Sequence, residues 1–417
     1  MTLLHVVMDG RPIGDLDGTG PRLRLRYDPG AAASPAFVPL SVSMPATRAR
    51  WRGTPVRTWL EGLLPDREGV VRGWRAQFGV TDLNPESLLA HVGEDVAGAA
   101  QLVRPDRLDA VLRREGNVEP LSDDDLADVV RRARDDALPH DEESTTGRFS
   151  LAGAQVKVAL QRTGTGWALP LGAEPSTHIF KPAIPGLADQ DVTEVLTMRT
   201  ASLLGLPTAH AFLTELGDER VVGVERYDRI QVDGRWHRVH QEDLCQATGT
   251  RPLRKYESQG GLGVAGCGDV IREHCGQRDV ERFAQAIVFS YLVRGSDAHA
   301  RNYSLLLTPG DVRLAPLYDL NMTFSFGEDW AHRLAMRVGG EDRLDRIETR
   351  HWTRFSDELR LDPGWAVDQV RTMARRLPDA LATVRAELDL DALAPTTNTV
   401  VQDRAARWCE TVTSRTR

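Results

Sequence analysis

The sequence predicts an α+β protein with two lobes, the first rich in strands and the second mostly helical. The length of 417 residues exceeds what one ordinary hydrophobic core supports, so two or three packed units are expected. Short apolar strands recur from Arg148 to Arg229, interrupted by a single clear helix at 190–204 that ends at a glycine. Beyond residue 240 the apolar spacing is helical, most clearly over 281–295 and 363–393.

The chain divides into four segments in order. The first contains strands broken by Asp-Gly and Gly turns and then a stretch at 56–79 with helical spacing of Trp, Leu and Val. The second is charged throughout and predicts short helices and a mobile connection. The expected boundaries are 1–105 for an N-terminal α+β subdomain, 106–147 for the charged helical connector, 148–228 for the core of the strand-rich lobe, and 229–417 for the helical lobe.

Composition restricts the class of protein. With 41% apolar and 27% charged residues the chain is typical of a globular protein, and no apolar stretch reaches the roughly 18–20 residues of a membrane span. The N-terminus lacks the basic flank and cleavage site of a signal peptide, so we expect a cytoplasmic protein without a membrane partner. The net charge of −8 argues against a surface dominated by nucleic-acid binding.

Lysine is scarce. Of 52 basic residues only Lys157, Lys181 and Lys255 are lysine. A lysine kept in so arginine-rich a chain can serve where a compact ammonium fits and a planar guanidinium does not.

The strongest chemical signal is the stretch GSDAHARNYSLLL, followed by RLAPLYDLNMT. A buried helix ends at Gly295, and the chain enters a polar loop that holds Asp297, His299 and Asn302. It then forms a strand, turns at 309–311, and returns as a second strand that we expect to end at Asp319.

Phosphoryl transfer needs this set of groups. A carboxylate accepts the proton of the attacking hydroxyl, while an amide oxygen and a second carboxylate hold Mg²⁺ against the phosphates. Asp297, Asn302 and Asp319 fit these roles in order, and the first two have the spacing of the protein-kinase catalytic loop. Two other interpretations stay open at this point: metal ligation by Asp297 and His299 in a hydrolase, and a plain Asp/Asn-capped loop.

Two further elements favour the kinase interpretation. Lys181 ends an apolar strand, and Glu194 follows about thirteen residues later in the first turns of the next helix. A strand lysine bound to the α and β phosphates and held by a helix glutamate is the kinase arrangement, although a surface pair without contact would have the same spacing. The apolar strand that leads into Glu225–Tyr227 could present backbone groups to an adenine as a hinge, or be only an edge strand.

Several motifs together resemble the HipA family of kinases. They are SLAGAQVK, THIFKP, VERYDR, QEDLCQATG, KYES-x-GG-x-G, SDAHARN and LAPLYD, with PLSVSMP, LEGLLPD and VGEDVAGAAQL in the N-terminal segment. The resemblance extends from near residue 5 to about 355. It implies a two-lobed, protein-kinase-like fold with an extra N-terminal subdomain, and ATP and Mg²⁺ between the lobes.

The resemblance also implies roles for particular residues. Asp297 would be the catalytic base, assisted by Lys181 and Glu194, and Asn302 and Asp319 would hold the metal. Ser150 would be phosphorylated by the kinase itself, which switches the enzyme off. The nucleotide would contact a phosphate loop, a hinge and the catalytic loop, through Ala152, Gly153, Ala154, Gln155, Val156, Lys157, Lys181, Glu225, Arg226, Tyr227, His299, Ala300, Arg301, Asn302, Tyr318 and Asp319. The phosphate loop has only one glycine, so without the resemblance it predicts just a turn between strands.

The same resemblance predicts the partners. The protein would be a growth-arresting toxin that phosphorylates an aminoacyl-tRNA synthetase such as the glutamyl enzyme, neutralised by a HipB-like helix-turn-helix antitoxin. The mixed charge of residues 337–352, where a DNA-contacting family member is lysine-rich, argues against direct DNA contact. The alternatives are a kinase of the same fold for a small molecule or peptide, and a catalytically silent nucleotide-binding scaffold.

Overall fold

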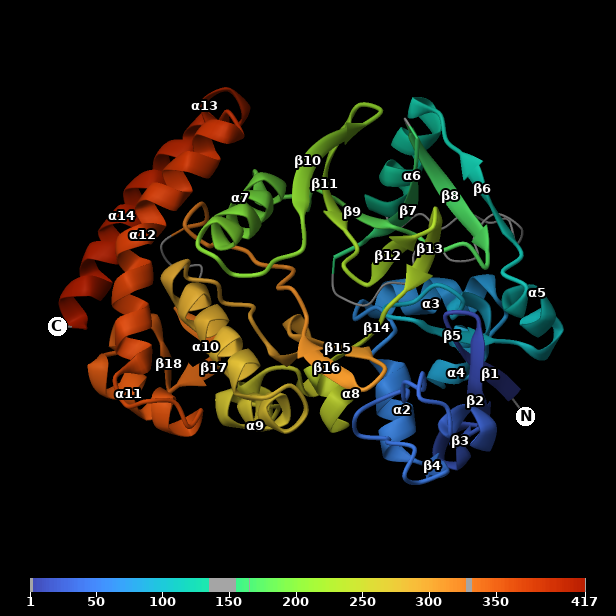
Figure 1. The fold of residues 1–417 in the computed structure, drawn as a ribbon. Helices are drawn as coiled ribbons and strands as arrows, with labels where there is room; N and C mark the ends of the chain where they lie inside the picture. The colour runs from blue at the N-terminus through green and yellow to red at the C-terminus, as the bar shows by residue number, and fades with distance from the viewer. Residues whose placement is uncertain (1–2, 135–154, 165, 328–331, 417) are drawn as a thin grey trace. The chain divides into compact units, whose positions relative to one another are not determined.

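The computed structural model describes residues 3–134, 155–164, 166–327 and 332–416 (Figure 1). Contacts between Cα atoms divide the chain into two compact units. Unit 1 comprises Met1–Ile184, Thr214–Pro252 and Leu305–Val312, and unit 2 comprises Pro185–Leu213, Leu253–Ser304 and Arg313–Arg417. Among the described residues, no helix is both long and apolar enough to cross a membrane.

Unit 1 begins with a five-stranded sheet whose order is β4-β3-β2-β1-β5. Its strands are β1 Leu3–Met8, β2 Arg11–Asp17, β3 Arg24–Tyr27, β4 Arg50–Arg52 and β5 Ala100–Val103. The accompanying helices are α1 Pro29–Ala32, α2 Thr54–Glu61, α3 Glu68–Gln77 and α4 Pro85–Val92. One face of the sheet carries the core, in which Tyr27 and Trp59 are at most 1% exposed. The helical pattern at 56–79 forms two helices, because Pro65 disfavours helical backbone at the residue before it.

A second sheet of unit 1 has the order β10-β11-β9-β7-β8-β6. Its strands are β6 Gly116–Pro120, β7 Val158–Thr163, β8 Gly166–Gly172, β9 His178–Pro182, β10 Ala211–Leu216 (of which 214–216 belong to unit 1) and β11 Glu219–Glu225. The helix α6, Asp123–Arg134, contacts β7, β9 and β11 through an apolar face, and α5 spans Leu108–Leu112. The charged segment after residue 105 therefore includes an edge strand, β6, where the sequence predicts only helices and a connection.

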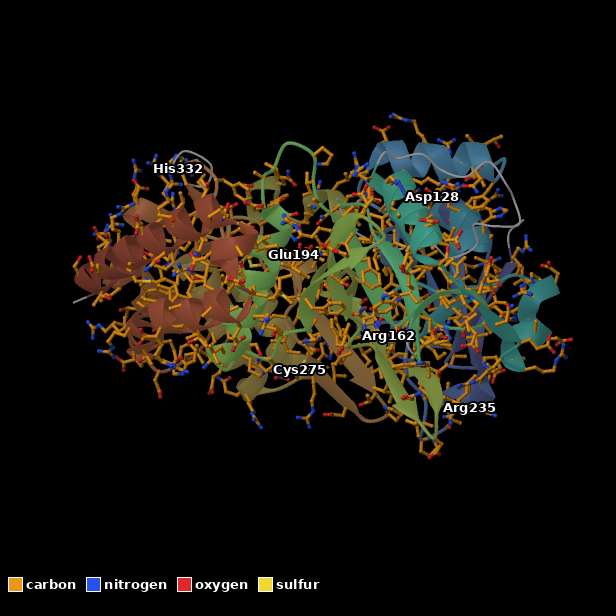
Figure 2. All side chains as sticks on the ribbon, turned by 90° about the horizontal axis from the view of Figure 1, so that it is seen from above. Asp128, Arg162, Glu194, Arg235, Cys275 and His332 are labelled. Carbon is orange, nitrogen blue, oxygen red and sulfur yellow. The ribbon has the colours of Figure 1, made fainter. Side chains whose placement is uncertain are left out.

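Three smaller elements complete unit 1. The hairpin of β12, Arg229–Val232, and β13, Arg235–Arg238, turns at Asp233-Gly234, where both residues have positive φ as a type I′ turn requires. Arg235, labelled in Figure 2, begins the second strand of this hairpin and is exposed. A three-stranded sheet joins β14 His240–Asp243, β15 Ser304–Thr308 and β16 Asp311–Leu314, of which 305–312 belong to unit 1, and α8 spans Leu244–Thr248.

Unit 2 is mostly helical. Its long helices are α7 Gln190–Leu203, α9 Val264–His274, α10 Gln277–Leu292, α11 Thr349–Glu358, α12 Trp365–Glu387 and α14 Pro395–Arg415, with the short α13 Leu390–Leu393 and the hairpin β17 Arg333–Val338 and β18 Glu341–Arg343. In Figure 1, α14 runs alongside α12, which also contacts α7, α10 and α11. Tyr291 of α10 is fully buried and meets Trp352 of α11 edge to face, with ring centroids 5.2 Å apart. The helices expected near 190–204 and 281–295 are thus α7 and α10.

Candidate active site

The polar loop after α10 presents one carboxylate to solvent. The helix ends at Leu292, and the Gly295 N–H donates to the Ser290 carbonyl at 2.7 Å, which closes the turn. Asp297 follows, with a side chain that is 67% exposed, and the backbone N–H of His299 donates to the Asp297 carbonyl at 2.8 Å. Asn302 ends a short 3₁₀ turn and is only 5% exposed. The loop therefore exposes the Asp297 carboxylate, while Asn302 five residues later is buried.

Two aromatic rings lie next to this carboxylate. The Tyr256 hydroxyl donates a hydrogen bond to Oδ1 of Asp297, and the Tyr256 ring meets the His299 ring edge to face at 4.9 Å. Burial lowers the pKa of His299 to about 4, although Asp297 acts in the opposite direction, so the imidazole is neutral at pH 7. Its Nδ1 is buried and has no hydrogen-bond partner among the described residues.

The Tyr318 hydroxyl connects the two segments that carry the predicted metal ligands, Asn302 and Asp319. The Tyr318 hydroxyl donates to the carbonyl of Arg301 at 2.7 Å and accepts from Ser304 Oγ at the same distance, so the residue before Asp319 is fixed to the residue before Asn302. Asp319 has φ of 58°, an uncommon backbone conformation for a residue other than glycine. One amide and one carboxylate suit Mg²⁺, which proteins commonly hold with one or two carboxylates and substrate phosphates.

The second strand of the hairpin is shorter than the sequence predicts. It ends at Leu314, five residues before Asp319, instead of continuing to the aspartate. The chain then forms a parallel bridge at Leu317, whose N–H donates to the Pro207 carbonyl at 2.8 Å. Asp319 is thus placed by a bridge within unit 2 and not by the hairpin.

Unit 1 holds the predicted phosphate contacts. Lys181 lies on β9 opposite Val222 of β11 and is 4% exposed. Gln155 donates from Nε2 to the Pro182 carbonyl at 3.0 Å, and Lys157 donates from Nζ to the Gln155 carbonyl at 3.3 Å. The end of the predicted phosphate loop is therefore tied to the strand of Lys181. Four predicted residues lie outside the described part of the chain: Ser150, Ala152, Gly153 and Ala154.

Glu194 lies on α7 in unit 2. Its side chain, labelled in Figure 2, is fully buried. It accepts a hydrogen bond from Gln190 Nε2 at 3.2 Å. Because Lys181 belongs to unit 1, the pairing of Lys181 with Glu194 stays a prediction.

The predicted hinge follows β11 in unit 1. Glu225, the last residue of the strand, is exposed, and its carboxylate lies 4.0 Å from Nε2 of His178. The backbone N–H of Arg226 donates to the Thr177 carbonyl at 2.9 Å, and the Tyr227 hydroxyl donates to Gln241. The Arg226 side chain is 1% exposed and turns into the interior, so only its backbone could reach a nucleotide.

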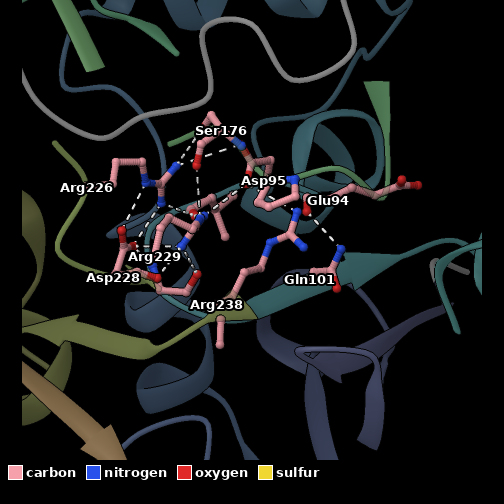
Figure 3. A network of polar contacts seen from close by, with 12 residues as sticks. Glu94, Asp95, Gln101, Ser176, Arg226, Asp228, Arg229 and Arg238 are labelled. Carbon is pink, nitrogen blue, oxygen red and sulfur yellow. Dashed lines mark hydrogen bonds and ion pairs between the residues drawn. The ribbon is translucent and has the colours of Figure 1, made fainter. Parts of the chain in front are cut away.

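Behind this hinge lies a buried ion network, made of Asp95, Arg226, Asp228, Arg229 and Arg238 (Figure 3). Arg226 donates to both oxygens of Asp228, at 3.0 and 2.9 Å, and Arg229 donates to Oδ1 of Asp95 at 2.9 Å. The guanidinium groups also reach backbone carbonyls of the N-terminal segment, those of Val96 and Gly98. The network therefore fixes the 95–98 turn to the predicted hinge.

Electrostatics keep these buried groups charged. Burial alone would raise the pKa of Asp95, but Arg229, Arg226 and Arg238 outweigh it and lower that pKa to about 2. The pKa of Asp228 is likewise lowered, against the effect of burial, by Arg226 and Arg229. Burial lowers the pKa of Arg229 to about 10, which still leaves it charged at pH 7. The sequence gives one hint of the network: two carboxylates, Glu94 and Asp95, interrupt the apolar and glycine-containing stretch VGEDVAGAA, although nothing in it tells which of the two is buried.

Comparison with known proteins gives the family. Residues 149–381 match the HipA-like C-terminal domain, and residues 4–103 match the HipA N-terminal domain. Y4mE of Sinorhizobium fredii, named as a candidate kinase, is 34% identical over 398 residues, which cover 91% of this chain and 90% of that protein. The serine/threonine-protein kinase toxin HipA of Shewanella oneidensis is 29% identical over 367 residues, covering 83% of this chain and 81% of the toxin.

One solved structure has a similar fold over nearly the whole length of this chain. It is a chain of the Shewanella oneidensis toxin–antitoxin complex of HipA, HipB and operator DNA, which superposes with a TM-score of 0.83 at 26% identity and 99% coverage of both chains. The predicted α+β, protein-kinase-like fold is thereby confirmed. By both of its domains, this chain belongs to the HipA family of serine/threonine kinase toxins.

Proposed function

We propose that this protein is an ATP-dependent serine/threonine protein kinase that acts as a growth-arresting toxin in the cytoplasm. The observation that carries the proposal is the loop of unit 2. In this loop the Asp297 side chain is exposed and the Asn302 side chain, five residues later, is buried. The Tyr318 hydroxyl bond that ties Asp319 to the same loop supports a joint role for these residues.

The chemistry would proceed in one transfer. The acceptor hydroxyl loses its proton to the Asp297 carboxylate as its oxygen bonds to the γ-phosphorus of ATP, and the bond to the departing ADP breaks. Asn302 and Asp319 would hold Mg²⁺, which neutralises charge on the phosphates when bound. Lys181, oriented by Glu194, would hold the α and β phosphates.

The remaining nucleotide contacts would come from both units. Gln155, Val156 and Lys157, which are half-buried, would cover the phosphates together with the residues that precede them. The hinge at 225–227 would offer backbone groups to the adenine. In the catalytic loop, buried His299, Ala300 and Arg301 would shape the floor beneath the phosphates.

The proposed partners rest on membership of the HipA family. The proposed substrate is an aminoacyl-tRNA synthetase such as the glutamyl enzyme, and its phosphorylation would arrest translation. The proposed inhibitor is a HipB-like helix-turn-helix antitoxin, supported by the similarity to the HipA chain solved with HipB and operator DNA. Any approach to DNA would then be indirect, through the antitoxin.

Ser150 is the proposed site of autophosphorylation. A phosphate there adds nearly two negative charges beside a loop meant for the phosphates of ATP, and repulsion would disable the loop.

Mass spectrometry of the purified chain tests the proposal. The wild type, Asp297→Gln and the control Asp311→Gln, which changes an exposed aspartate at the start of β16, are each incubated with Mg·ATP and analysed intact and as peptides. We expect one phosphate at Ser150 in the wild type and the control, and none in Asp297→Gln. Phosphorylation of Asp297→Gln would refute the role of Asp297. No phosphate in any of them, with Ser150 unmodified at the start, would favour a small-molecule or peptide kinase or a silent scaffold.

A further inference from the structure

The motif Lys255–Gly263 has no part in the proposed chemistry, yet it lies against the catalytic loop within unit 2. The Tyr256 hydroxyl reaches Oδ1 of Asp297 across 41 residues of sequence. Beside it, the N–H of Ala300 donates to the Lys255 carbonyl at 3.4 Å, which joins the two segments through their backbones. The contact is therefore between two segments that are fixed to each other, not between two freely moving side chains.

Glycines in the motif hold Tyr256 in place. The N–H groups of Gln259 and Gly261 both donate to the Tyr256 carbonyl, at 3.0 and 3.1 Å. Gly260 has φ of +80°, which favours glycine, and a Cβ on Gly261 would lie 1.9 Å from the Arg254 carbonyl oxygen. Both glycines are thus needed for the turn that carries the tyrosine.

The same turn is anchored to a strand and to a ring. Oε2 of Glu257 accepts the backbone N–H of Arg337 on β17 at 2.6 Å, which fixes the residue after Tyr256. The His299 ring supports the Tyr256 ring from the side, and the Lys255 ammonium lies 5.5 Å from the same ring's centroid. The hydroxyl therefore comes from a side chain that is restrained at its backbone and along its ring.

The Asp297 carboxylate needs such a restraint because few neighbouring groups limit its rotation. At 67% exposure its carboxylate would rotate among several rotamers, and a base must point at the hydroxyl it serves. Tyr256 occupies Oδ1, whereas Oδ2 has no hydrogen-bond partner among the described residues. One oxygen is held and the other is left for an incoming hydroxyl.

We propose that Tyr256 is a positioning residue for the base: its hydroxyl fixes the Asp297 carboxylate so that Oδ2 faces the acceptor hydroxyl. This inference rests on the proposed kinase activity. Tyr256 does not touch the nucleotide in this role, so its loss slows transfer and leaves the binding of ATP unchanged. A tyrosine that instead blocked the base would have the opposite effect, since its removal would speed transfer.

Tyr256→Phe tests the proposal, because it removes the hydroxyl and keeps the ring that packs on His299. Phosphatase-treated protein is mixed with Mg·ATP at a series of concentrations, and phosphate incorporation into the chain is followed by intact mass. We expect the rate at saturating ATP to fall about tenfold, while the half-saturating ATP concentration and the melting temperature stay within error. An unchanged or raised rate, or a weakened affinity for ATP, would overturn the proposal.

Tyr27→Phe is the matched control. The Tyr27 hydroxyl is buried in the N-terminal core, where it donates to the Met44 carbonyl at 2.7 Å and accepts from the Leu40 N–H at 2.9 Å. Its loss should lower the melting temperature by about 4 °C and leave the rate unchanged. The failure of the kinase proposal is distinguishable: the wild type would then incorporate no phosphate, whereas failure of the positioning role alone leaves wild type and Tyr256→Phe equally active.

Discussion

The buried ion network of unit 1 and the loop of unit 2 that holds Asp297 use carboxylates in opposite ways. In the network Asp95 and Asp228 are 7% and 2% exposed, and their oxygens are bound by guanidinium and backbone donors. In the loop Asp297 is 67% exposed, with a single donor on one oxygen. A carboxylate that fixes structure is saturated and withdrawn from water, whereas one that accepts a proton needs an oxygen left open.

The largest effect on stability should come from breaking the network at Asp95. Asp95→Asn removes a charge that compensates Arg229 and Arg238, and both guanidinium groups stay buried. Breaking a buried pair on one side costs about 3–5 kcal/mol of unfolding free energy. Urea unfolding of wild type and variant measures this loss, and a loss below about 1 kcal/mol would mean that the network contributes little to the stability of unit 1.

A second effect should appear with pH at His240, which lies beside the network. This buried imidazole donates from Nε2 to the Leu40 carbonyl at 3.0 Å, and burial lowers its pKa to about 4. The unfolded chain then binds the proton first, so the stability from this group is complete above pH 6.5 and is lost as pH falls to 4. The stability difference between wild type and His240→Gln should shrink by about 3 kcal/mol from pH 7 to pH 4.

That difference isolates His240 from Glu242, which acts in the other direction. Burial raises the pKa of Glu242 to about 8, so its contribution is present below about pH 4.5 and is lost as pH rises through 8. Because Glu242 is present in both proteins, its effect cancels in the comparison. A stability difference that does not change with pH would contradict the assignment of His240.

A smaller effect is expected one residue before Asp95. Glu94 pairs with Arg107 through two bonds of 3.1 Å, but the two side chains are 25% and 35% exposed. Solvent screens such a pair, so Glu94→Gln should cost less than about 1 kcal/mol. Urea unfolding again measures the loss. Equal losses for Glu94→Gln and Asp95→Asn would show that burial does not determine how much each carboxylate contributes to stability.

The smallest change in stability should follow substitution of the exposed Asp297, the proposed base. Asp297→Asn keeps the volume and removes a charge that lies in water, so unfolding free energy should stay within about 0.5 kcal/mol of the wild type. Thermal and urea unfolding check this, and the same protein should transfer no phosphate. A strongly destabilised Asp297→Asn would mean that Asp297 supports the fold, which would remove the contrast between the two regions.

Local signals in the sequence predicted much of the fold and only part of the site. The helices α7 and α10 follow from apolar spacing and from glycines beyond their ends. The strand β6 was missed because its residues, GNVEP, include glycine, asparagine and proline, which are rare in strands, and its partner β8 begins 46 residues after β6 ends. Spacing pointed to Asp297 and Asn302 as a loop pair, but it carries no information on side-chain direction. The bond from Tyr256 to Asp297 and the burial of Arg226 therefore appear only in the folded chain.

The bond between Asp95 and Arg229 also limits when this part of the fold can form during synthesis of the chain. The two residues are 134 positions apart, so a ribosome adding about 5–20 residues per second exposes Asp95 roughly ten seconds before its partner exists. During that interval the N-terminal sheet can form, but the turn at 95–98 has no guanidinium to receive it. The ion network is therefore completed only after Arg229 has been made, and a nascent chain shorter than about 230 residues lacks the bonds that fix the 95–98 turn to the predicted hinge.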